Sequence, residues 1–433
     1  MNEIIKIILI FPIFLLFLSV PINIFKSSNN QINLNLLIFN LIINLNILLL
    51  FSFFPIPIEN YQLILLGIYL LIFIYYLFST KLNLKNLIKK SYLNFLILFV
   101  TFIILSINIS NQLNLGWDAK YFYYIKSLFF FEGLGLTELS EFEHNKWHPY
   151  FGSYLWAFFW SLPYFEYEYF GRLFYLFTFC IAIYFISYSN KKNSIVQSII
   201  YLFLLTLLFS YERFSGLQEV LLFSLLLISS KVLYDLNFDK KFLNLLILLL
   251  IINLLIWIKS EGIVYSLIIF SITLLNKKIS FKEKITFFLI IIILLCIKYL
   301  VYSVYNFEAN SQPYNINQIF NITLESFIYK LEKITIYSTY YSLKNPLLVV
   351  GIFILIYLNF NKMNRLDLRN YNIFFTLNIL FIFGAYLLRD MEIIYSLKTT
   401  LERIIFTSSS FYIYLICLFI NKLIEKKEKL WKL

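Results

Sequence analysis

The segment 110–172 gathers side chains that could do chemistry, outside the longest apolar runs of the chain. It contains Asp118, four of the six tryptophans and both histidines, His144 and His148. An ionised aspartate can take a proton from a hydroxyl group or hold a metal ion. Because Asp118 begins an amphipathic run, it could equally cap a helix. Both roles are therefore open for this carboxylate.

Glu143, His144 and His148 form a second group of polar side chains. The two histidines are four residues apart, so on a helix they would share one face and could hold Zn²⁺ with the carboxylate. The spacing is not HExxH, however, and Pro149 indicates that a helix starts here. Glu143 and His144 are thus candidate ligands of a divalent metal ion, an open cofactor. His148 either caps the helix after Pro149 or contacts a substrate phosphate.

Several cations lie at the ends of apolar runs, where they could meet a phosphate group. Lys259 opens the sequence Lys-Ser-Glu-Gly, which also contains Glu261, and Arg389, Lys398 and Arg403 lie in or beside the segment 389–403. Arginine suits bidentate contacts to phosphate. The alternative is that these side chains extend from helix ends toward water. In the turn YERFSGLQE, we expect Glu212 or Glu219 to pair with Arg213 or Arg172.

The composition indicates a membrane protein with many helices. The 433 residues are 61% hydrophobic and 14% charged, with a mean hydropathy of +0.78, whereas soluble domains have roughly 25% charged residues. Spanning helices need about 20 apolar residues, and by that criterion we predict an all-α polytopic bundle with about thirteen spans and juxtamembrane helices on the outer face. The expected spans are 4–24, 33–55, 61–78, 92–109, 168–188, 195–210, 216–234, 242–258, 262–276, 285–303, 345–359, 371–388 and 404–421.

The charges predict an orientation. One alternate set of loops, together with the segment 422–433, carries 22 lysines and arginines, and the opposite set carries 11. The positive-inside rule makes the first set cytoplasmic, which places the N-terminus outside and the C-terminus inside a cytoplasmic (inner) membrane. The net charge of +12 is thereby explained without a nucleic-acid partner. Of the 24 acids, 18 lie on or near the outer side. This suggests that the function of the protein requires polar residues on that side.

The same count organises the chain into five segments. We expect four spans in 1–109, an outer loop with juxtamembrane helices in 110–167, the middle spans in 168–303, a second outer loop in 304–344 and the last spans in 345–433. Residues 148–164 are apolar enough for a short span, but a span there would invert every later loop. We therefore expect an aromatic helix at the outer interface, where Trp156 and Trp160 are typical residues.

An ordered set of motifs carries a resemblance to a family. The chain reads Gly116-Trp117-Asp118, then His148-Pro149-Tyr150-Phe151, then Glu168-Tyr169-Phe170-Gly171-Arg172-Leu173. This order resembles the GT-C glycosyltransferases, multi-span enzymes that take sugars from polyprenyl-phosphate carriers on the outer membrane face. The group includes the lipid A aminoarabinose transferases and the protein O-mannosyltransferases. The chain departs from it at Tyr150, where the family has a second proline, and in the three additional spans that precede the span leading into the loop.

The resemblance implies a membrane glycosyltransferase of the cell envelope. Asp118 would be the general base or would position the acceptor. His148, Lys259, Glu261, Arg389, Lys398 and Arg403 would bind substrate. The partners would be a polyprenyl-phosphate sugar donor, a glycan, lipid or protein acceptor, and membrane lipid. An O-antigen polymerase or ligase, with its working loop at 304–344, is one alternative. A lipid-linked glycan transporter or flippase, which would need ionisable groups such as Lys298 within a span, is another.

Overall fold

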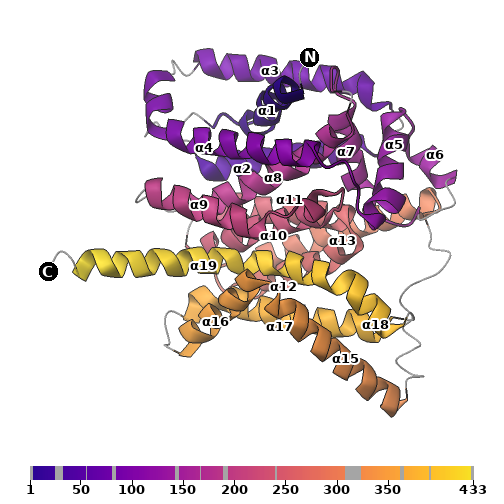
Figure 1. Cartoon of the computed structure of the whole chain (residues 1–433), viewed down its shortest axis with the longest axis vertical. Helices are drawn as coiled ribbons and strands as arrows, with labels where there is room; N and C mark the ends of the chain where they lie inside the picture. The colour runs from indigo at the N-terminus through magenta and orange to yellow at the C-terminus, as the bar shows by residue number, and fades with distance from the viewer. Residues whose placement is uncertain are drawn as a thin grey trace. The chain divides into compact units, whose positions relative to one another are not determined.

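The computed structural model describes residues 3–24, 33–54, 56–79, 84–141, 146–165, 167–188, 194–238, 241–307, 323–360, 365–389 and 392–430. These ranges fold into helices and contain no β-strand, so the chain is all-α there (Figure 1). Each of the thirteen runs predicted to span the membrane contains a helix.

The number of spans is a separate matter from the number of helices. Among the described residues, six helices are long and apolar enough to cross a membrane, or seven if one bent pair counts as a single span. Four further apolar helices are shorter, among them Ser194–Leu208 and Ser260–Leu274. The structure therefore has the apolar helices typical of a membrane protein, and the predicted thirteen spans are not confirmed.

The chain divides into two compact units, which are described one at a time. Unit 1 consists of Met1–Leu221, Asn253–Ser260 and Cys296–Phe307, and unit 2 of Leu222–Ile252, Glu261–Leu295 and Glu308–Leu433. The unit boundaries fall inside α10 (Glu219–Asp235), α11 (Lys241–Ile258), α12 (Ser260–Leu274) and α13 (Phe281–Val304).

Unit 1 contains the following complete helices: α1 (Glu3–Ser19), α2 (Leu34–Phe51), α3 (Ile58–Ser79), α4 (Leu84–Ser110), the π-helix η1 (Ala119–Tyr124), α5 (Ile125–Phe131), α6 (Leu136–Glu141), α7 (Phe151–Trp160), α8 (Tyr169–Ser187), α9 (Ser194–Leu208) and the 3₁₀ helix η2 (Tyr211–Phe214). All nineteen residues of α8 are buried, and α1, α4, α7 and α9 pack around it. Its phenylalanines interlock with those of its neighbours, as in the stacked pair Phe159 and Phe174, whose ring centroids are 4.0 Å apart. Helix α8 is the core of unit 1.

Helix α7 confirms one expectation and modifies another. It has ten residues, or about 15 Å at the helical rise, too short to cross a hydrocarbon layer of about 30 Å. All ten residues are buried, and Trp160 stacks on Phe131 of α5 at 4.2 Å. The aromatic side chains of α7 therefore pack inside unit 1, and the expected position on the membrane surface is not confirmed.

The end of α1 is held by asparagines of α2. Asn44 donates from its amide nitrogen to the carbonyl oxygens of Phe17 (2.8 Å) and Val20 (2.7 Å). Asn40 donates to Leu18 in the same way (3.0 Å). The last carbonyls of a helix have no partner within it and are costly to leave unpaired in an apolar interior. The two asparagines of α2 thus supply the hydrogen-bond donors that the last carbonyl groups of α1 lack.

Unit 2 contains α12 (Ser260–Leu274) except for its first residue, and then α15 (Leu324–Leu343), α16 (Pro346–Phe360), α17 (Arg365–Leu387), α18 (Ile393–Ser396), the π-helix η3 (Leu397–Leu401) and α19 (Glu402–Leu430). Helices α15, α16, α17 and α19 contact one another (Figure 1). The axes of α15 and α16 differ by 99° at a short break. The segment 304–344, predicted to be an outer loop, contains the helix α15, while 308–322 lies outside the described residues.

Replacing Asn44 tests how much this capping stabilises unit 1. Asn44→Leu leaves the Phe17 and Val20 carbonyls unpaired, and also removes the acceptor of the Tyr69 hydroxyl (2.6 Å). We expect the free energy of unfolding to fall by roughly 2 kcal/mol, measured as a lower apparent melting temperature in detergent. Thr206→Ala removes a hydroxyl that is bonded within its own helix at an exposed site and should leave melting unchanged. Equal melting of the two variants would contradict this role.

Candidate functional site

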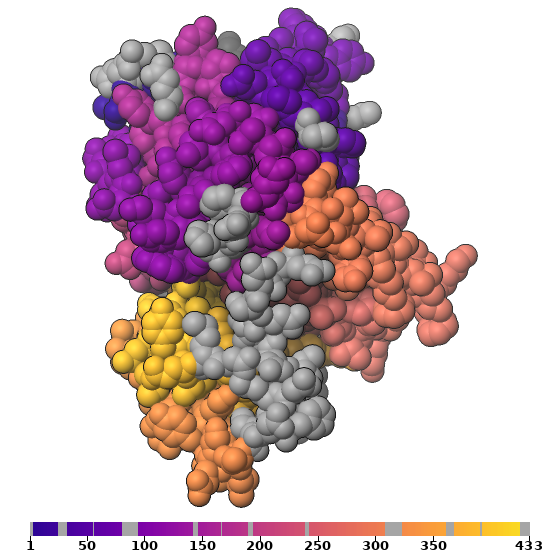
Figure 2. Space-filling model, turned by 90° about the vertical axis from the view of Figure 1, so that its right-hand side faces the viewer, coloured from indigo at the N-terminus to yellow at the C-terminus, as the bar shows by residue number. Residues whose placement is uncertain are grey.

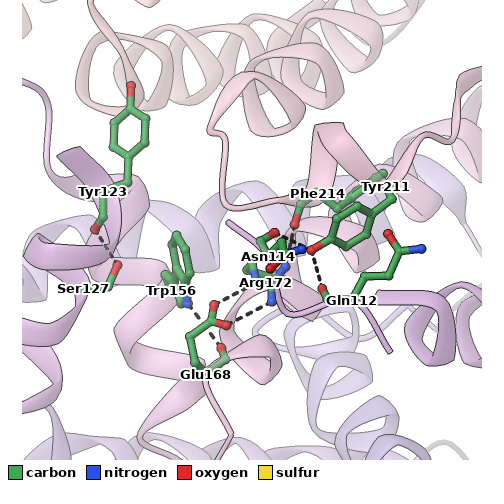
Figure 3. A network of polar contacts seen from close by, with 9 residues as sticks. All are labelled: Gln112, Asn114, Tyr123, Ser127, Trp156, Glu168, Arg172, Tyr211 and Phe214. Carbon is green, nitrogen blue, oxygen red and sulfur yellow. Dashed lines mark hydrogen bonds and ion pairs between the residues drawn. The ribbon is translucent and has the colours of Figure 1, made fainter. Parts of the chain in front are cut away.

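A buried arginine organises one end of α8. Arg172 is fully buried, and its guanidinium donates to both carboxylate oxygens of Glu168, at 2.8 and 3.0 Å. A third N–H donates to the carbonyl oxygen of Phe214, at 3.1 Å (Figure 3). Burial raises the pKa of Glu168, and the positive charge of Arg172 opposes that rise. The fork of Arg172 thus fixes η2 against α8.

The turn that follows η2 holds the segment leading to Asp118. The N–H of Gly116 donates to the Ser215 carbonyl oxygen at 3.0 Å. The Tyr211 hydroxyl donates to the carbonyl oxygens of Gln112 and Asn114 (Figure 3). Arg172 therefore positions the approach to Asp118 without touching it, through a chain of backbone hydrogen bonds.

Glycine is required at two close approaches beside this turn. A Cβ on Gly216, whose φ is +92°, would lie 2.5 Å from the Trp156 ring and 2.9 Å from the Ala119 Cβ. A Cβ on Gly171 would lie 2.2 Å from the Trp156 carbonyl oxygen, a backbone atom with little freedom to move. The indole N–H of Trp156 in turn donates to the Glu168 carbonyl oxygen at 3.3 Å. Trp156 is thus enclosed by α8, the turn and the start of η1.

Asp118 is half-buried in the first turn of the helix that continues as η1. Its side chain makes no capping hydrogen bond, so the capping role considered from sequence is not the one that the structure displays. Four residues further along, the ring of Phe122 lies 4.7 Å from the imidazole of His148. The helix that starts with Asp118 therefore meets His148 one turn later.

His148 is stacked between aromatic rings and is held neutral. Its imidazole lies 3.8 Å from the Trp147 ring as well as beside Phe122. Burial, and then the positive charges of Lys126 and Lys259, lower the pKa of His148 to about 3. Tyr150, without a side-chain cap, is the N-cap of α7, so His148 does not cap that helix. At neutral pH it offers a neutral imidazole, which can donate or accept a hydrogen bond.

Lys126 is a buried cation that sequence analysis did not single out. It is 1% exposed, and its ammonium group donates to the carbonyl oxygen of His148. Burial lowers the pKa of Lys126 to about 7, since a low-dielectric environment disfavours the charged form. It was missed because a lysine in the run YFYYIKSLFFF is indistinguishable by pattern from a surface lysine.

Lys259 joins the same cluster from the end of α11. Its ammonium lies 2.6 Å from a carboxylate oxygen of Glu219, and both side chains are largely buried. The pairing expected for Glu219 with Arg213 or Arg172 is therefore wrong, because Lys259 takes that place. Gln218 lies beside Glu219 in the sequence and links two other segments. Its amide nitrogen donates to the Ile258 carbonyl oxygen, and its amide oxygen accepts from the Ser153 N–H at 3.1 Å.

Lys298, the ionisable residue within a predicted span, has a structural partner. Its ammonium donates to the Ile256 carbonyl oxygen at 2.6 Å, in the last turn of α11. It lies 5.1 Å from the ring centre of Tyr302 and 5.9 Å from that of Trp257. A cation is favourable at the C-terminus of a helix, so Lys298 completes the end of α11, which holds Lys259.

The remaining predicted substrate-binding residues belong to unit 2. Arg389 donates to the Thr400 hydroxyl at 3.0 Å, and Arg403 to the Thr399 carbonyl oxygen at 3.0 Å. Lys398 is exposed on η3, and Glu261 lies half-buried in the first turn of α12. The three cations of unit 2 thus lie before α18 (Arg389), on η3 (Lys398) and at the start of α19 (Arg403). Glu143 and His144, the predicted metal ligands, lie outside the described residues.

Unit 1 therefore brings His148, Lys126, Lys259 and Glu219 into one cluster. The helix that starts with Asp118 reaches this cluster one turn later, at Phe122. Part of the stretch 111–141, purple in Figure 2, lies at the surface of unit 1. The pairing of Glu168 with Arg172 could be predicted from their spacing of four residues. The pairing of Glu219 with Lys259 joins distant segments, so no local pattern in the sequence predicts it. No family model, curated protein or solved structure matches the chain.

Gly171→Ala tests the close approach of α8 to Trp156. Because the added methyl meets a backbone oxygen at 2.2 Å, we expect destabilisation by about 3 kcal/mol, measured as a lower apparent melting temperature and a smaller folded fraction. Gly67→Ala is the matched control, since nothing lies within 4 Å of its Cβ on α3. It should stabilise the helix slightly. A Gly171→Ala protein that melts like the control would exclude the tight contact.

Lys126→Met tests the buried ammonium through its pH dependence. The folded pKa of about 7 lies below the unfolded value of about 10.4. Between these pH values the unfolded chain binds more protons, so stability should rise with pH and level off below pH 7. The apparent melting temperature at pH 7.5, 8.5 and 9.5 should rise less steeply in Lys126→Met than in the wild type. Lys120→Met, at an exposed site of η1, should keep the wild-type slope; equal slopes in all three proteins would refute the assignment.

Proposed function

We propose that this chain is a glycosyltransferase that moves a sugar from a polyprenyl-phosphate-linked donor to an acceptor hydroxyl on the outer face of a cytoplasmic membrane. The observation that carries the proposal is the cluster in unit 1. It combines a neutral imidazole, His148, with two amines, Lys126 and Lys259. The half-buried carboxylate of Asp118 lies one helical turn before Phe122, whose ring is beside His148. Glycosyl transfer needs a base at the acceptor and positive charge at the departing phosphate.

The reaction assigns a task to each group. Asp118 removes the proton of the acceptor hydroxyl, whose oxygen attacks the anomeric carbon of the sugar. The bond from that carbon to the phosphate oxygen breaks, and the lipid phosphate leaves with the electron pair. Lys259, whose ammonium is paired with Glu219, is proposed to supply positive charge to the departing phosphate. His148 donates a hydrogen bond from its neutral ring.

The residues of unit 2 stay in the proposal as further contacts. Arg389, Lys398 and Arg403 are proposed to bind the phosphate, and Glu261 the substrate. A divalent metal ion stays an open cofactor, since Glu143 and His144 lie outside the described residues. The proposed orientation, with the N-terminus outside and the C-terminus inside, follows from the distribution of basic residues.

A transporter is the proposal's main rival, and one contact bears on it. A transport pathway is typically marked by ionisable groups within spans. Lys298 was the clearest of these in the sequence, and its ammonium is engaged by the carbonyl at the end of α11. A cation that completes a helix end already has a structural role, which favours the transferase over the transporter.

Asp118→Asn tests the proposed base. The substitution preserves shape and removes no capping bond, so the protein should fold and melt normally. Transfer of labelled sugar from a polyprenyl-phosphate donor in proteoliposomes should fall about 100- to 10,000-fold. Glu132→Gln makes the same change at an exposed acid of the same outer segment and should leave transfer intact. Full transfer by folded Asp118→Asn would exclude this mechanism, and uptake of sugar without transfer in the wild type would favour a transporter.

A further inference from the structure

Unit 2 contains a cavity of about 320 Å³ among α15, α16, α17 and α19. This volume lies at the small end of the range for ligand pockets. No charged side chain lines it, and apolar residues such as Ile379, Phe383 and Ile405 make up most of its wall. Its helices include two candidate membrane spans and the bent pair of α15 and α16. The cavity is therefore built for an apolar ligand that a membrane can supply.

Two of the hydroxyl groups on α15 that line the cavity are already hydrogen-bonded within the helix. Thr335 donates to the Leu331 carbonyl oxygen at 2.8 Å, and Thr339 donates to that of Thr335 at 2.9 Å. A threonine whose hydroxyl is bonded to its own helix presents little beyond its methyl group. Two of the hydroxyl-bearing residues in the wall are thus compatible with hydrocarbon.

Two other polar groups lack acceptors among the described residues. The Ser338 hydroxyl oxygen is buried and has no hydrogen-bond partner there. Asn378 accepts from the Ser408 hydroxyl through its amide oxygen, at 3.0 Å, while its amide nitrogen has no acceptor among the same residues. Both side chains line the cavity. A buried donor without an acceptor is costly, so the cavity offers two donors within an apolar wall.

We propose that this cavity binds one acyl chain of an ester-linked membrane lipid. The hydrocarbon would fill the apolar part, and the ester carbonyl oxygen, which has two lone pairs, would accept from Ser338 and Asn378. An isoprenoid chain would fill the same space but contains no acceptor along its hydrocarbon. Water could satisfy the donors but gains nothing from apolar walls. This inference is independent of the proposed glycosyl transfer.

The experiment uses the full chain in nanodiscs with two photoreactive phospholipid probes that differ only in an ester or an ether linkage to the labelled chain. After illumination and digestion, peptides of α15 and α17 should carry at least about five times more of the ester probe than of the ether probe, because one neutral hydrogen bond gives about that ratio and the ester carbonyl would accept two. The double variant Ser338→Ala with Asn378→Leu should reduce this ratio to about one.

A matched variant keeps the result interpretable. Ser326→Ala makes the same serine-to-alanine change as Ser338→Ala, but at an exposed site of α15. It should preserve the preference for the ester probe. Ser338→Ala alone removes one donor with little change in volume, and should halve the preference or more if the double variant does not fold. Equal labelling of α15 and α17 by both probes in the wild type would overturn the proposal. Stronger labelling by a photoreactive isoprenyl phosphate than by the ester probe would also overturn it.

Discussion

The interaction on which most of unit 1 depends is the fork between Arg172 and Glu168. A guanidinium with no solvent exposure must have every available charge and donor compensated, because an unpaired charge in an apolar interior costs several kcal/mol. Glu168 supplies the charge and two acceptors, and the Phe214 carbonyl supplies a third acceptor. This requirement links an acid before α8, the core helix itself and a turn some forty residues later. The segment before Asp118 is attached to that same turn.

The cluster built on this frame is unusual in how it distributes charge. The carboxylate of Glu219 compensates Lys259, burial brings the pKa of Lys126 to about 7, and His148 is neutral. Lys126 is thus close to the point at which a new negative group nearby would change its protonation. An anionic ligand would raise the pKa of both His148 and Lys126, because opposite charge favours the protonated form. Under the proposed transfer, the lipid phosphate would be such an anionic group.

The sequence predicted the helices well because apolar runs of this length and composition have few other structures open to them. It also predicted that 148–164 would not cross a membrane. It could not predict that α7 would be buried on every side, because Trp and Tyr suit a membrane surface and a protein core equally. Asp118, His148 and Lys259 were named from order and spacing alone. Lys126, Gln218 and the Glu219–Lys259 pair depend on contacts between distant segments, which no local pattern records.

The asparagines of α2 have a consequence for how the chain enters a bilayer. Asn40 and Asn44 are unfavourable in hydrocarbon on their own, and so are the carbonyl groups that they cover at the end of α1. The amide groups of α2 and the carbonyl groups of α1 therefore satisfy each other's hydrogen bonding. During synthesis α1 and α2 would partition into lipid most favourably as a hairpin, with the amide groups already engaged.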